Sequence, residues 1–436
     1  MIAFDELWRT WALIRDPLTA LPDIAQEGDV LLASSPVGRV WVLHHPTDVH
    51  QVLVKDFRKF RKDVWTQQLD DVLGNGLLTS EGQDWRRHRR LVTPAFGPAA
   101  LPGYAATMVE CAEASIAEWG DRTSIDAHAF TSALTLDVVA RTLFGADLGD
   151  AAAAISGALD DYMRWYMGFL NSGFPLPAVI PTPANLARVR ALRVLDETVN
   201  RLVASASPED ATLIGRLLAA RDEEGGLSAV QLRDEAITLL MAGHETTAGW
   251  LLFALVALAE HPGVEERVHA ELDAVLGGRS PTLDDLPSLP YTRRVLLEVL
   301  RLTPPAWAVG RETVEPIEVG GKQFEPGDQV WIGPWSIHRD PRWYSDPLEF
   351  RPDRWLELEG TLPKGAFLPF GAGPRMCVGK RFAEMEAHLC LAVLAQRCSL
   401  RLAPGTKVEL MPSITLRPAG AVPMVAHRRT AARRVA

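Results

Sequence analysis

The chain has 436 residues, of which 47% are hydrophobic and 23% charged, an ordinary composition for a globular protein with a large core. Its formal net charge of −10 argues against a general nucleic-acid-binding protein. Length alone would predict two or three domains.

Cysteine usage and the N-terminus indicate where the protein works. The four cysteines form no Cys-x-x-Cys pair and no zinc-ligand spacing: they are Cys111, Cys377, Cys390 and Cys398. This pattern favours a reducing, cytoplasmic setting. Residues 1–11 carry acids and an arginine where a signal peptide would need an unbroken apolar core, so we expect neither export nor a membrane anchor.

The first hundred residues mix strand-like and helix-like segments. Residues 40–43 are apolar and bounded by turn-forming residues, which predicts a buried strand. Residues 63–82 lack a sustained period and are predicted to form a loop or a broken helix. Trp85 and Arg89 stand four residues apart and share one helix face, which would make a suitable clamp for a carboxylate. Taken alone, a basic helix face is more commonly just solvated.

Residues 104–224 are predicted to be mostly helical, with a proline-rich break at residues 171–183. Aromatic and apolar side chains flank that break: Tyr162, Met163, Trp165, Tyr166, Met167, Phe169, Leu170 and Phe174. Such a cluster is more commonly core than a ligand site. A break between helices can also form a lid, and an apolar lid would suit an apolar substrate.

A long helix is predicted from the capping-box pattern of Ser228 and Gln231 to Glu260. Its expected length is about 50 Å. The polar segment Ala242-Gly-His-Glu-Thr-Thr247 interrupts its most apolar part. This interruption needs an explanation, because burying polar groups costs free energy.

Three interpretations of the polar segment fail. A transmembrane helix would not carry a histidine, a glutamate and two threonines at its centre. A zinc site of the His-Glu-x-x-His type lacks its second histidine, because Ala248 stands there. A plain core helix would not place Glu245 in its most apolar run. The remaining interpretation is a helix with a polar notch, which Gly243 and Gly249 make thin and where a displaced backbone hydrogen bond leaves room for a small ligand.

One more helix is predicted within residues 284–303, and two proline residues end it. Glu298 and Arg301 share one face of this helix. By itself such a pair is a weak signal, because surface pairs of this kind are common.

The remaining C-terminal segments include several predicted strands. Residues 317–319 and 329–332 are predicted to be hairpin strands, because a Gly-Asp turn precedes the second one. Residues 399–418 again have strand-like character.

One cysteine stands in a distinctive loop. Cys377 is preceded by Arg375 and framed by Gly371, Gly373 and Gly379, and a helical pattern begins directly after the loop. A nearby cation and a helix N-terminus lower the pKa of a thiol, and glycines let the backbone approach a flat ligand. A cysteine that only packs in a core would need neither the glycines nor the arginine. The loop therefore predicts a thiolate that binds a partner.

This loop resembles the haem-binding loop of the cytochrome P450 family, whose pattern is Phe-Gly-x-Gly-x-Arg-x-Cys-x-Gly. Every fixed position is matched, by Phe370, Gly371, Gly373, Arg375, Cys377 and Gly379. The resemblance implies that Cys377 is the axial thiolate ligand of a haem iron. It also implies that Phe370, Gly371, Arg375 and Gly379 contact the haem.

Further segments resemble other parts of the same family. Trp85 and Arg89 match its Trp-x-x-x-Arg motif, and Arg311 matches an arginine in the strand that passes beside the haem. All three are implied to bind haem propionates. The family's structural Glu-Arg-Arg set, which would fix the cysteine loop, is matched by Glu298, Arg301 and Arg354.

The polar segment of the long helix resembles the oxygen-binding motif of the family. The resemblance implies that Ala242 and Gly243 contact the haem. It implies that Glu245 delivers protons, and that Thr246 hydrogen-bonds to bound dioxygen or to an ordered water.

The resemblance implies a mainly α fold, the cytochrome P450 fold, in a single domain over residues 1–436 with a long central helix. The helical part would comprise residues 85–305 and 377–400. A small β-rich part would lie mainly within residues 25–60 and 306–335. This implication replaces the two or three domains that length alone predicts.

The implied reaction is monooxygenation, in which one oxygen atom of O2 enters a C–H bond of a lipophilic small molecule such as a terpenoid, a steroid or a fatty acid. Haem b would be the cofactor, and electrons from NAD(P)H would arrive through a separate ferredoxin or flavodoxin-type protein with its reductase. A monomer without nucleic-acid or membrane contacts is expected. Glu245 and Thr246 favour this O2-driven reaction over a haem protein that only binds a ligand, a haem-thiolate isomerase or dehydratase, and a peroxide-driven enzyme.

The substrate pocket implied by the resemblance is largely apolar. Its walls would come from residues 64–78, 162–176, 239–247 and 307–309, where no arginine is an obvious carboxylate anchor. The side chains predicted to face the substrate are Val64, Leu78, Phe169, Phe174, Leu239, Trp307, Val309 and Ile414. A neutral lipophilic molecule is therefore favoured.

Overall fold

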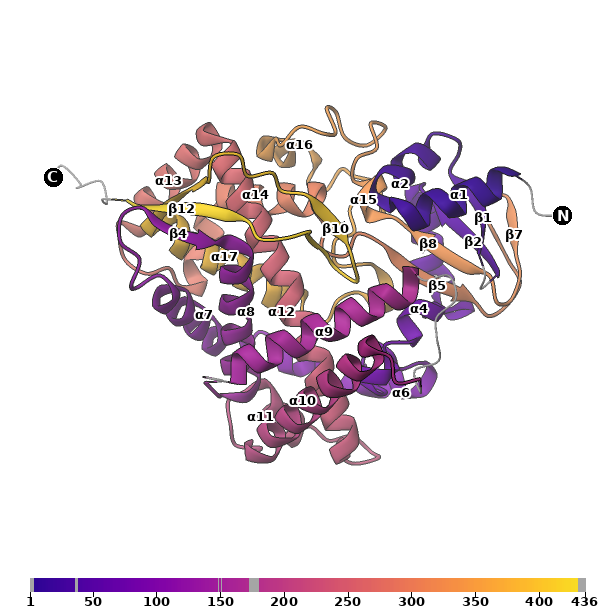
Figure 1. The fold of residues 1–436 in the computed structure, drawn as a ribbon, viewed down its shortest axis with the longest axis horizontal. Helices are drawn as coiled ribbons and strands as arrows, with labels where there is room; N and C mark the ends of the chain where they lie inside the picture. Colours follow the sequence, from indigo (N-terminus) through magenta and orange to yellow (C-terminus); the bar gives the residue numbers. More distant parts are fainter. Residues whose placement is uncertain (1–3, 36–37, 148, 150, 172–179, 430–436) are drawn as a thin grey trace.

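A helical body makes up most of the molecule, and a β-rich part lies at the end where the N-terminal helices are found (Figure 1). The computed structural model describes residues 4–35, 38–147, 149, 151–171 and 180–429. The predicted mainly α fold with a long central helix is confirmed.

The helices in the described residues follow in this order: α1 (Phe4–Arg15), α2 (Pro17–Ala25), α3 (Pro46–His50), α4 (Val64–Gln67), α5 (Asp70–Leu73), α6 (Gly82–Val92), α7 (Leu101–Ser115), α8 (Ala127–Phe144), α9 (Ala151–Asn171), α10 (Pro183–Ser205), α11 (Leu213–Ala219), α12 (Ala229–Glu260), α13 (Pro262–Leu276), α14 (Pro290–Leu302), α15 (Pro334–Ile337), α16 (Trp355–Leu358) and α17 (Lys380–Arg397). The strands are β1 (Val30–Ser35), β2 (Gly38–Leu43), β3 (Phe60–Arg61), β4 (Thr123–Asp126), β5 (Val309–Thr313), β6 (Ile317–Val319), β7 (Lys322–Phe324), β8 (Gln329–Ile332), β9 (Cys398–Leu402), β10 (Leu410–Pro412), β11 (Leu416–Pro418) and β12 (Pro423–Arg428). Residues 63–82, predicted to form a loop or a broken helix, contain the two short helices α4 and α5.

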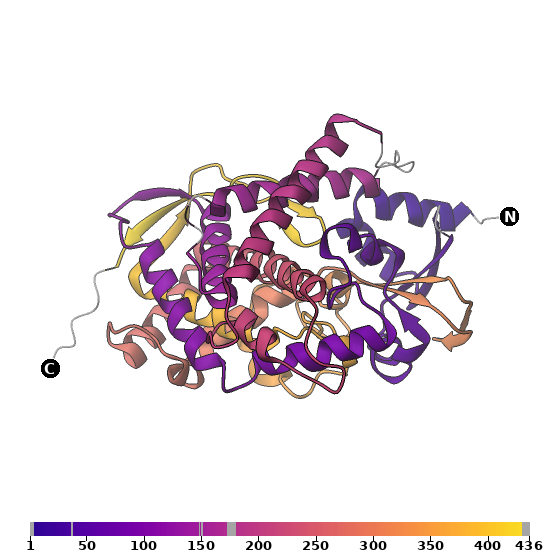
Figure 2. The ribbon, with the colours of Figure 1, turned by 90° about the horizontal axis from the view of Figure 1, so that it is seen from below.

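Helix α12 runs through the middle of the helical body (Figures 1 and 2) and packs against α8, α10, α14 and α17. Its predicted capping box is present: the Ser228 hydroxyl accepts from the Gln231 amide at 3.2 Å, and the Gln231 side chain accepts from the Ser228 amide at 2.9 Å. Among the described helices α12 alone is long and apolar enough to cross a membrane, yet 78% of its apolar window is buried inside the protein. Its apolar composition therefore serves the core.

The main sheet has five strands in the order β1-β2-β8-β5-β3. β1 and β2 form an antiparallel hairpin, β8 joins β2 in parallel with Val40 opposite Gln329, and β5 lies antiparallel to β8. Buried residues of this sheet form a hydrophobic cluster together with residues from neighbouring segments, among them Leu368. The Leu368 amide also donates to His338 Nε2 at 3.1 Å. The sheet thereby supports the segment that leads into the cysteine loop.

The predicted hairpin between residues 317–319 and 329–332 is wrong. β6 pairs with β7, whereas β8 lies in the middle of the five-stranded sheet. The reason is local, because Gly320 and Gly321 follow β6 with φ values of 55° and 71°. Two consecutive residues with positive φ form the tight turn that a hairpin prefers.

Strands also lie outside the two ranges predicted to be β-rich. β4, β12 and β9 form a three-stranded antiparallel sheet, and β10 pairs with β11. Ile414 and Thr415 lie in the turn between β10 and β11, where the Ser413 amide donates to the Thr415 carbonyl at 3.1 Å. This turn reaches α12, where the Thr415 hydroxyl donates to Glu245.

Candidate functional site

The cysteine loop is shaped by its backbone and by close packing. The Cys377 amide donates to the Phe370 carbonyl at 2.9 Å. Gly371 and Gly373 have φ values of 70° and 69°, a conformation that favours glycine. A Cβ on Gly373 would overlap the carbonyl oxygen of Leu53. These contacts hold the loop in one conformation.

Replacing Gly373 with alanine is expected to destabilise the protein more than the same change at Gly371. Both variants bear the strain of a positive φ, about 1–2 kcal/mol. Only the Gly373 variant also displaces the Leu53 backbone, because a Cβ on Gly371 meets no atom within 4 Å. Urea unfolding midpoints measure the difference, and equal midpoints for the two variants would contradict this account of the loop.

The pKa of the Cys377 thiol does not follow the sequence prediction. Burial raises this pKa above its usual value, and the Gly379 amide and the Arg89 guanidinium oppose the rise. Arg375, which was expected to lower the pKa, forms an ion pair with Glu81 instead. The predicted low pKa is therefore wrong for the protein alone, because desolvation of the thiolate outweighs the surrounding donors. A coordinated metal ion would deprotonate the thiol outright.

Three cations gather beside the cysteine loop: Lys62, Arg311 on β5, and Arg375. Burial lowers the pKa of all three, and the pKa of Lys62 falls to about 7 because Arg311 and Arg375 add to the effect of burial. Two carboxylates, Asp63 and Glu81, face the same group. Cations outnumber carboxylates there, so the group is suited to an anionic ligand.

Helix α6 brings Trp85 and Arg89 to this group. The ring of Trp85 is buried, and the guanidinium of Arg375 lies 4.1 Å from its centroid. Burial lowers the pKa of Arg89, while the thiolate form of the loop cysteine raises it. His88 Nδ1 lies 2.8 Å from Glu235 Oε1, with both side chains fully buried. This pair fixes α6 on α12.

The polar notch of α12 lies within a segment that is α-helical over its whole length. The displaced backbone hydrogen bond stays a prediction. The Thr246 hydroxyl donates to the Ala242 carbonyl at 2.6 Å. The side chain of Ala242 is exposed although most of α12 is buried. A Cβ on Gly243 would lie 3.0 Å from Val139, so this glycine allows α8 to pack closely.

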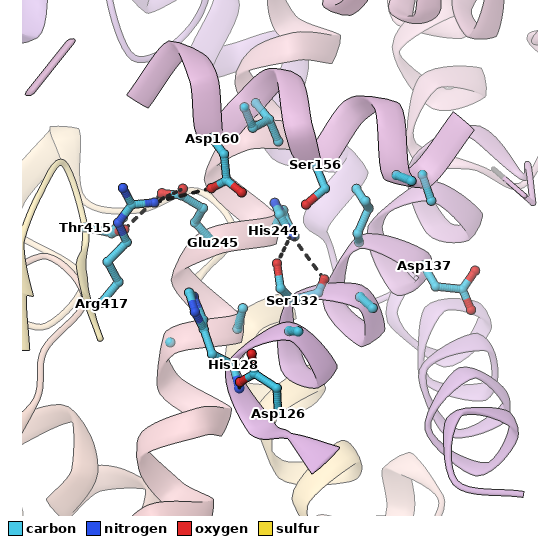
Figure 3. A pocket seen from close by; sticks show the side chains of 18 of the residues that line it. Asp126, His128, Ser132, Asp137, Ser156, Asp160, His244, Glu245, Thr415 and Arg417 are labelled. Carbon is cyan, nitrogen blue, oxygen red and sulfur yellow. Dashed lines mark hydrogen bonds and ion pairs between the residues drawn. The ribbon is translucent and has the colours of Figure 1, made fainter. Parts of the chain in front are cut away.

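Glu245 points into a cavity of about 650 Å³ between α8, α9, α12 and the β10–β11 hairpin (Figure 3). Glu245 Oε2 accepts from the Thr415 hydroxyl at 2.9 Å, and Oε1 lies 3.9 Å from Arg417 Nη1. The same Nη1 lies 3.5 Å from Asp160 Oδ1. Burial raises the pKa of Glu245, and Arg417 and Thr415 oppose that rise. The predicted proton-carrying acid is thus buried and paired on one side.

The structure brings the predicted Glu-Arg-Arg set together in a buried network. Glu298 accepts from Arg301 at 3.0 and 2.8 Å and from Arg354 at 2.8 Å. The Trp355 indole donates to the same carboxylate at 3.0 Å. Both guanidiniums also donate to backbone carbonyls, those of residues 338, 345, 346, 347 and 349. Every charge in the network therefore has partners, which buried ions require.

Some predicted substrate-facing residues lie in one aromatic group. The Trp307 indole donates to the Ser413 carbonyl at 2.7 Å, next to Ile414 in the β10–β11 turn. Ring centroids of Trp307 and Trp331 lie 6.1 Å apart, and those of Trp331 and Trp65 lie 5.6 Å apart. The segments that contain these residues therefore meet although they are far apart in the sequence.

The other predicted substrate-facing residues lie on several different elements. Val64 begins α4, Val309 begins β5, Leu239 is buried on α12, and Leu78 packs against the main core. The side chain of Phe169 and the whole of Phe174 lie outside the described residues.

Sequence reasoning did not single out several charged residues of the site. Lys62, Asp160 and Arg417 carry no local motif, and only the fold brings them to the site. Glu386 of α17 is fully buried beside Thr247, and burial raises the pKa of its carboxyl well above the usual value. No apolar run surrounds this glutamate as one surrounds the acid in α12, since Glu384 and His388 stand two residues on either side of it.

Comparisons with known proteins agree with these features. A sequence model described as Cytochrome P450 matches residues 27–422. Cyclooctatin synthase of Streptomyces melanosporofaciens is 39% identical to this chain, over 93% of the chain and 90% of that protein. Cyclooctat-9-en-7-ol 5-monooxygenase of the same organism is 36% identical, over 92% of this chain and 88% of that protein. Pentalenene oxygenase of Streptomyces avermitilis is also 36% identical, over 92% of this chain and 90% of that protein.

A solved structure has the same fold. The crystal structure of the cytochrome P450DA heme domain superimposes on this chain with a TM-score of 0.85 at 26% sequence identity. The match covers 96% of this chain and 94% of that one.

Proposed function

Since this chain belongs to the cytochrome P450 family, we propose that it inserts one oxygen atom of O2 into a C–H bond of a cyclic terpenoid. The chain is a haem-thiolate monooxygenase with haem b as cofactor and O2 as co-substrate, and its electrons come from NAD(P)H through redox partners. The observation that carries the substrate class is the set of relatives, which are named after cyclooctatin, cyclooctat-9-en-7-ol and pentalenene.

Several features support haem as the group that Cys377 holds. The Cys377 side chain is exposed, although burial dominates its pKa, as expected for a sulfur that faces a ligand inside the protein. Lys62, Arg311 and Arg375 together suit the two propionates of haem b, since guanidinium–carboxylate hydrogen bonds are strong. When bound, the haem supplies a redox-active iron that activates O2.

The residues next to Cys377 would hold the sulfur as a thiolate. The Gly379 amide and the Arg89 guanidinium both favour the charged form. Phe370 packs edge-on against Trp250 of α12, with ring centroids 5.9 Å apart. The cysteine loop and the central helix are thereby joined through a buried aromatic contact, which holds the two sides of the site at a fixed separation.

Replacing Thr246 with alanine is expected to uncouple electron consumption from product formation. The Thr246 hydroxyl lies on the same face of α12 as the exposed Ala242, to whose carbonyl it donates. Without this hydroxyl the proton-carrying group on this face of α12 is lost, so electrons from NAD(P)H would be released as peroxide and product per NAD(P)H should fall by roughly tenfold or more. Peroxide and product assays measure the change. Thr246→Ser is the control and should restore coupling, whereas full coupling in Thr246→Ala would contradict the assigned role.

A binding screen tests the substrate class. Ferric holoenzyme is titrated with pentalenene, a steroid and a saturated fatty acid, and the shift of the Soret band from low spin to high spin is recorded. We expect a saturable shift with the terpene. A shift with only the steroid or the fatty acid would contradict the proposed class. Turnover under ¹⁸O2 should place one labelled oxygen atom in the product, which a ligand carrier or an isomerase would not do.

We also propose the finer properties of the partner and the setting. The electron donor would be a ferredoxin- or flavodoxin-type protein, and the exposed Arg381 at the start of α17 would attract its acidic surface. The protein would be a cytoplasmic monomer, which the mostly buried α12 and the free cysteines support. The rate of reduction should fall as salt rises, and size-exclusion chromatography reports the oligomeric state.

A further inference from the structure

The polar cavity beside Glu245 has a distinctive charge. Its lining carries five carboxylates against two guanidiniums: Asp126, Asp137, Asp147, Asp160, Glu245, Arg141 and Arg417. A cleft in which one sign of charge predominates raises the local concentration of counter-ions. Here the counter-ions are cations, and protons are among them.

We propose that this cavity is the compartment from which Glu245 takes up the protons of the reaction, and that Arg417 is the residue that positions Glu245 toward it. The inference rests on the proposed function. Each turnover of that reaction consumes O2, two electrons from NAD(P)H and two protons, so that one oxygen atom enters the substrate and the other leaves as water. Glu245 directly precedes Thr246, so rotation of its side chain would carry a proton from the cavity to the Thr246 side of α12.

The contacts of Arg417 explain the positioning role. In Figure 3 dashed lines join its guanidinium to the carboxylates of Glu245 and Asp160, with Nη1 at 3.9 Å from the first and 3.5 Å from the second. Asp160 is on α9 and is largely exposed, whereas Glu245 is mostly buried. Arg417 therefore links a solvent-side acid to an interior one. The Thr415 hydroxyl holds the other oxygen of Glu245 at 2.9 Å.

Arg417 is the cation that controls the charge of Glu245. The other titratable and charged groups that line the cavity come from several elements: Asp126 from β4; His128, Asp137 and Arg141 from α8; Asp147 after α8; Asp160 from α9; His244 from α12; and Arg417 from β11. Burial lowers the pKa of His244 to about 4 and also lowers that of His128, so neither carries much charge at neutral pH. Arg417 lowers the pKa of Glu245 and Asp160 raises it.

Arg417 and Asp160 shift the pKa of Glu245 in opposite directions. Variants of the two residues therefore separate a change in charge from general structural damage, which would act in one direction. Glu245 must be ionised to accept a proton, so its pKa sets the acidic limb of the kcat–pH profile. Removing the cation in Arg417→Gln should move that limb to higher pH by about one unit. Removing the acid in Asp160→Asn should move it to lower pH. Arg417→Lys should return the acidic limb to its wild-type position. The substrate-induced spin shift should stay unchanged in all three variants.

The controls come from a neighbouring exposed pair. Arg164 and Asp161 on α9 form an ion pair at 2.7 Å, with side-chain exposures of 73% and 45%. Arg164→Gln and Asp161→Asn remove the same charges four residues and one residue after Asp160 on the same helix, and they should leave the pH profile unchanged. A shift of the limb in the same direction in Arg417→Gln and Asp160→Asn, or no shift in either, would overturn the proposal.

An infrared titration of the resting ferric holoenzyme gives a readout without turnover. The carbonyl band of protonated Glu245 is identified by its loss in Glu245→Gln. Its midpoint should rise in Arg417→Gln and fall in Asp160→Asn, and an unmoved midpoint overturns the proposal whatever the substrate is. Because this titration needs no substrate, it separates failure of the cavity proposal from failure of the terpenoid assignment.

Discussion

Replacing Cys377 with alanine should abolish the long-wavelength Soret band that reduced, carbon-monoxide-bound protein shows when a thiolate binds the iron. Loss of an outer-shell partner of a metal ligand costs roughly 10–100-fold in metal affinity or activity, and loss of the ligand itself should cost more. Monooxygenase turnover is therefore expected to fall below detection. Absorbance spectra and product assays on purified protein measure both effects.

Cys390→Ala is the matched control for this variant. Cys390 is fully buried, and burial holds the pKa of its thiol well above the usual value, so it stays protonated. Its removal should leave the spectrum intact and cost only packing energy. A thiolate-type spectrum that survives in the Cys377 variant, or disappears in the Cys390 variant, would show that the ligand has been assigned wrongly.

Glu298→Gln should have the largest effect on stability. The carboxylate accepts from Arg301, Arg354 and Trp355, and both guanidiniums are fully buried. The amide leaves two buried positive charges without a counter-ion, and breaking a buried ion pair in this way costs about 3–5 kcal/mol. Since this network holds the segment before the cysteine loop, haem content should fall as well. Urea unfolding and the haem-to-protein ratio measure the two losses.

Arg293→Gln on the same helix is the control. Arg293 pairs with Glu359 at 2.6 Å, but both side chains are about half exposed, and exposed pairs contribute about 0–1 kcal/mol. The free energy of unfolding should therefore change little in this variant. Similar losses of unfolding free energy in Glu298→Gln and Arg293→Gln would mean that burial does not determine how much an ion pair contributes to stability.

Local patterns predicted the fold well where neighbouring residues decide the structure. The capping box at Ser228 and the length of α12 are properties of one segment, and both were correctly predicted. Strand pairing was harder, because β6 and β8 are both short apolar runs. Their partners depend on the turn after β6 and on β2, which lies almost three hundred residues earlier.

The electrostatic state of the site was the least predictable part. The residues around Cys377 suggested a low pKa, but burial by distant segments raises it. Arg375 was expected to act on the thiol and pairs with Glu81 instead. Both errors have one cause, since desolvation and ion pairing depend on which segments pack together.

The sequence by itself determined the family, and it predicted the roles of the loop cysteine and of the acid–alcohol pair of α12, because those motifs are contiguous and their spacing carries the signal. Only the tertiary structure determined in which direction the pKa values shift and where the cavity beside Glu245 lies. Asp160 and Arg417 are 257 residues apart in the chain, and no local pattern links them. They meet because α9 and β11 both border the cavity beside α12, and Coulomb interactions act over distance in space and not along the sequence.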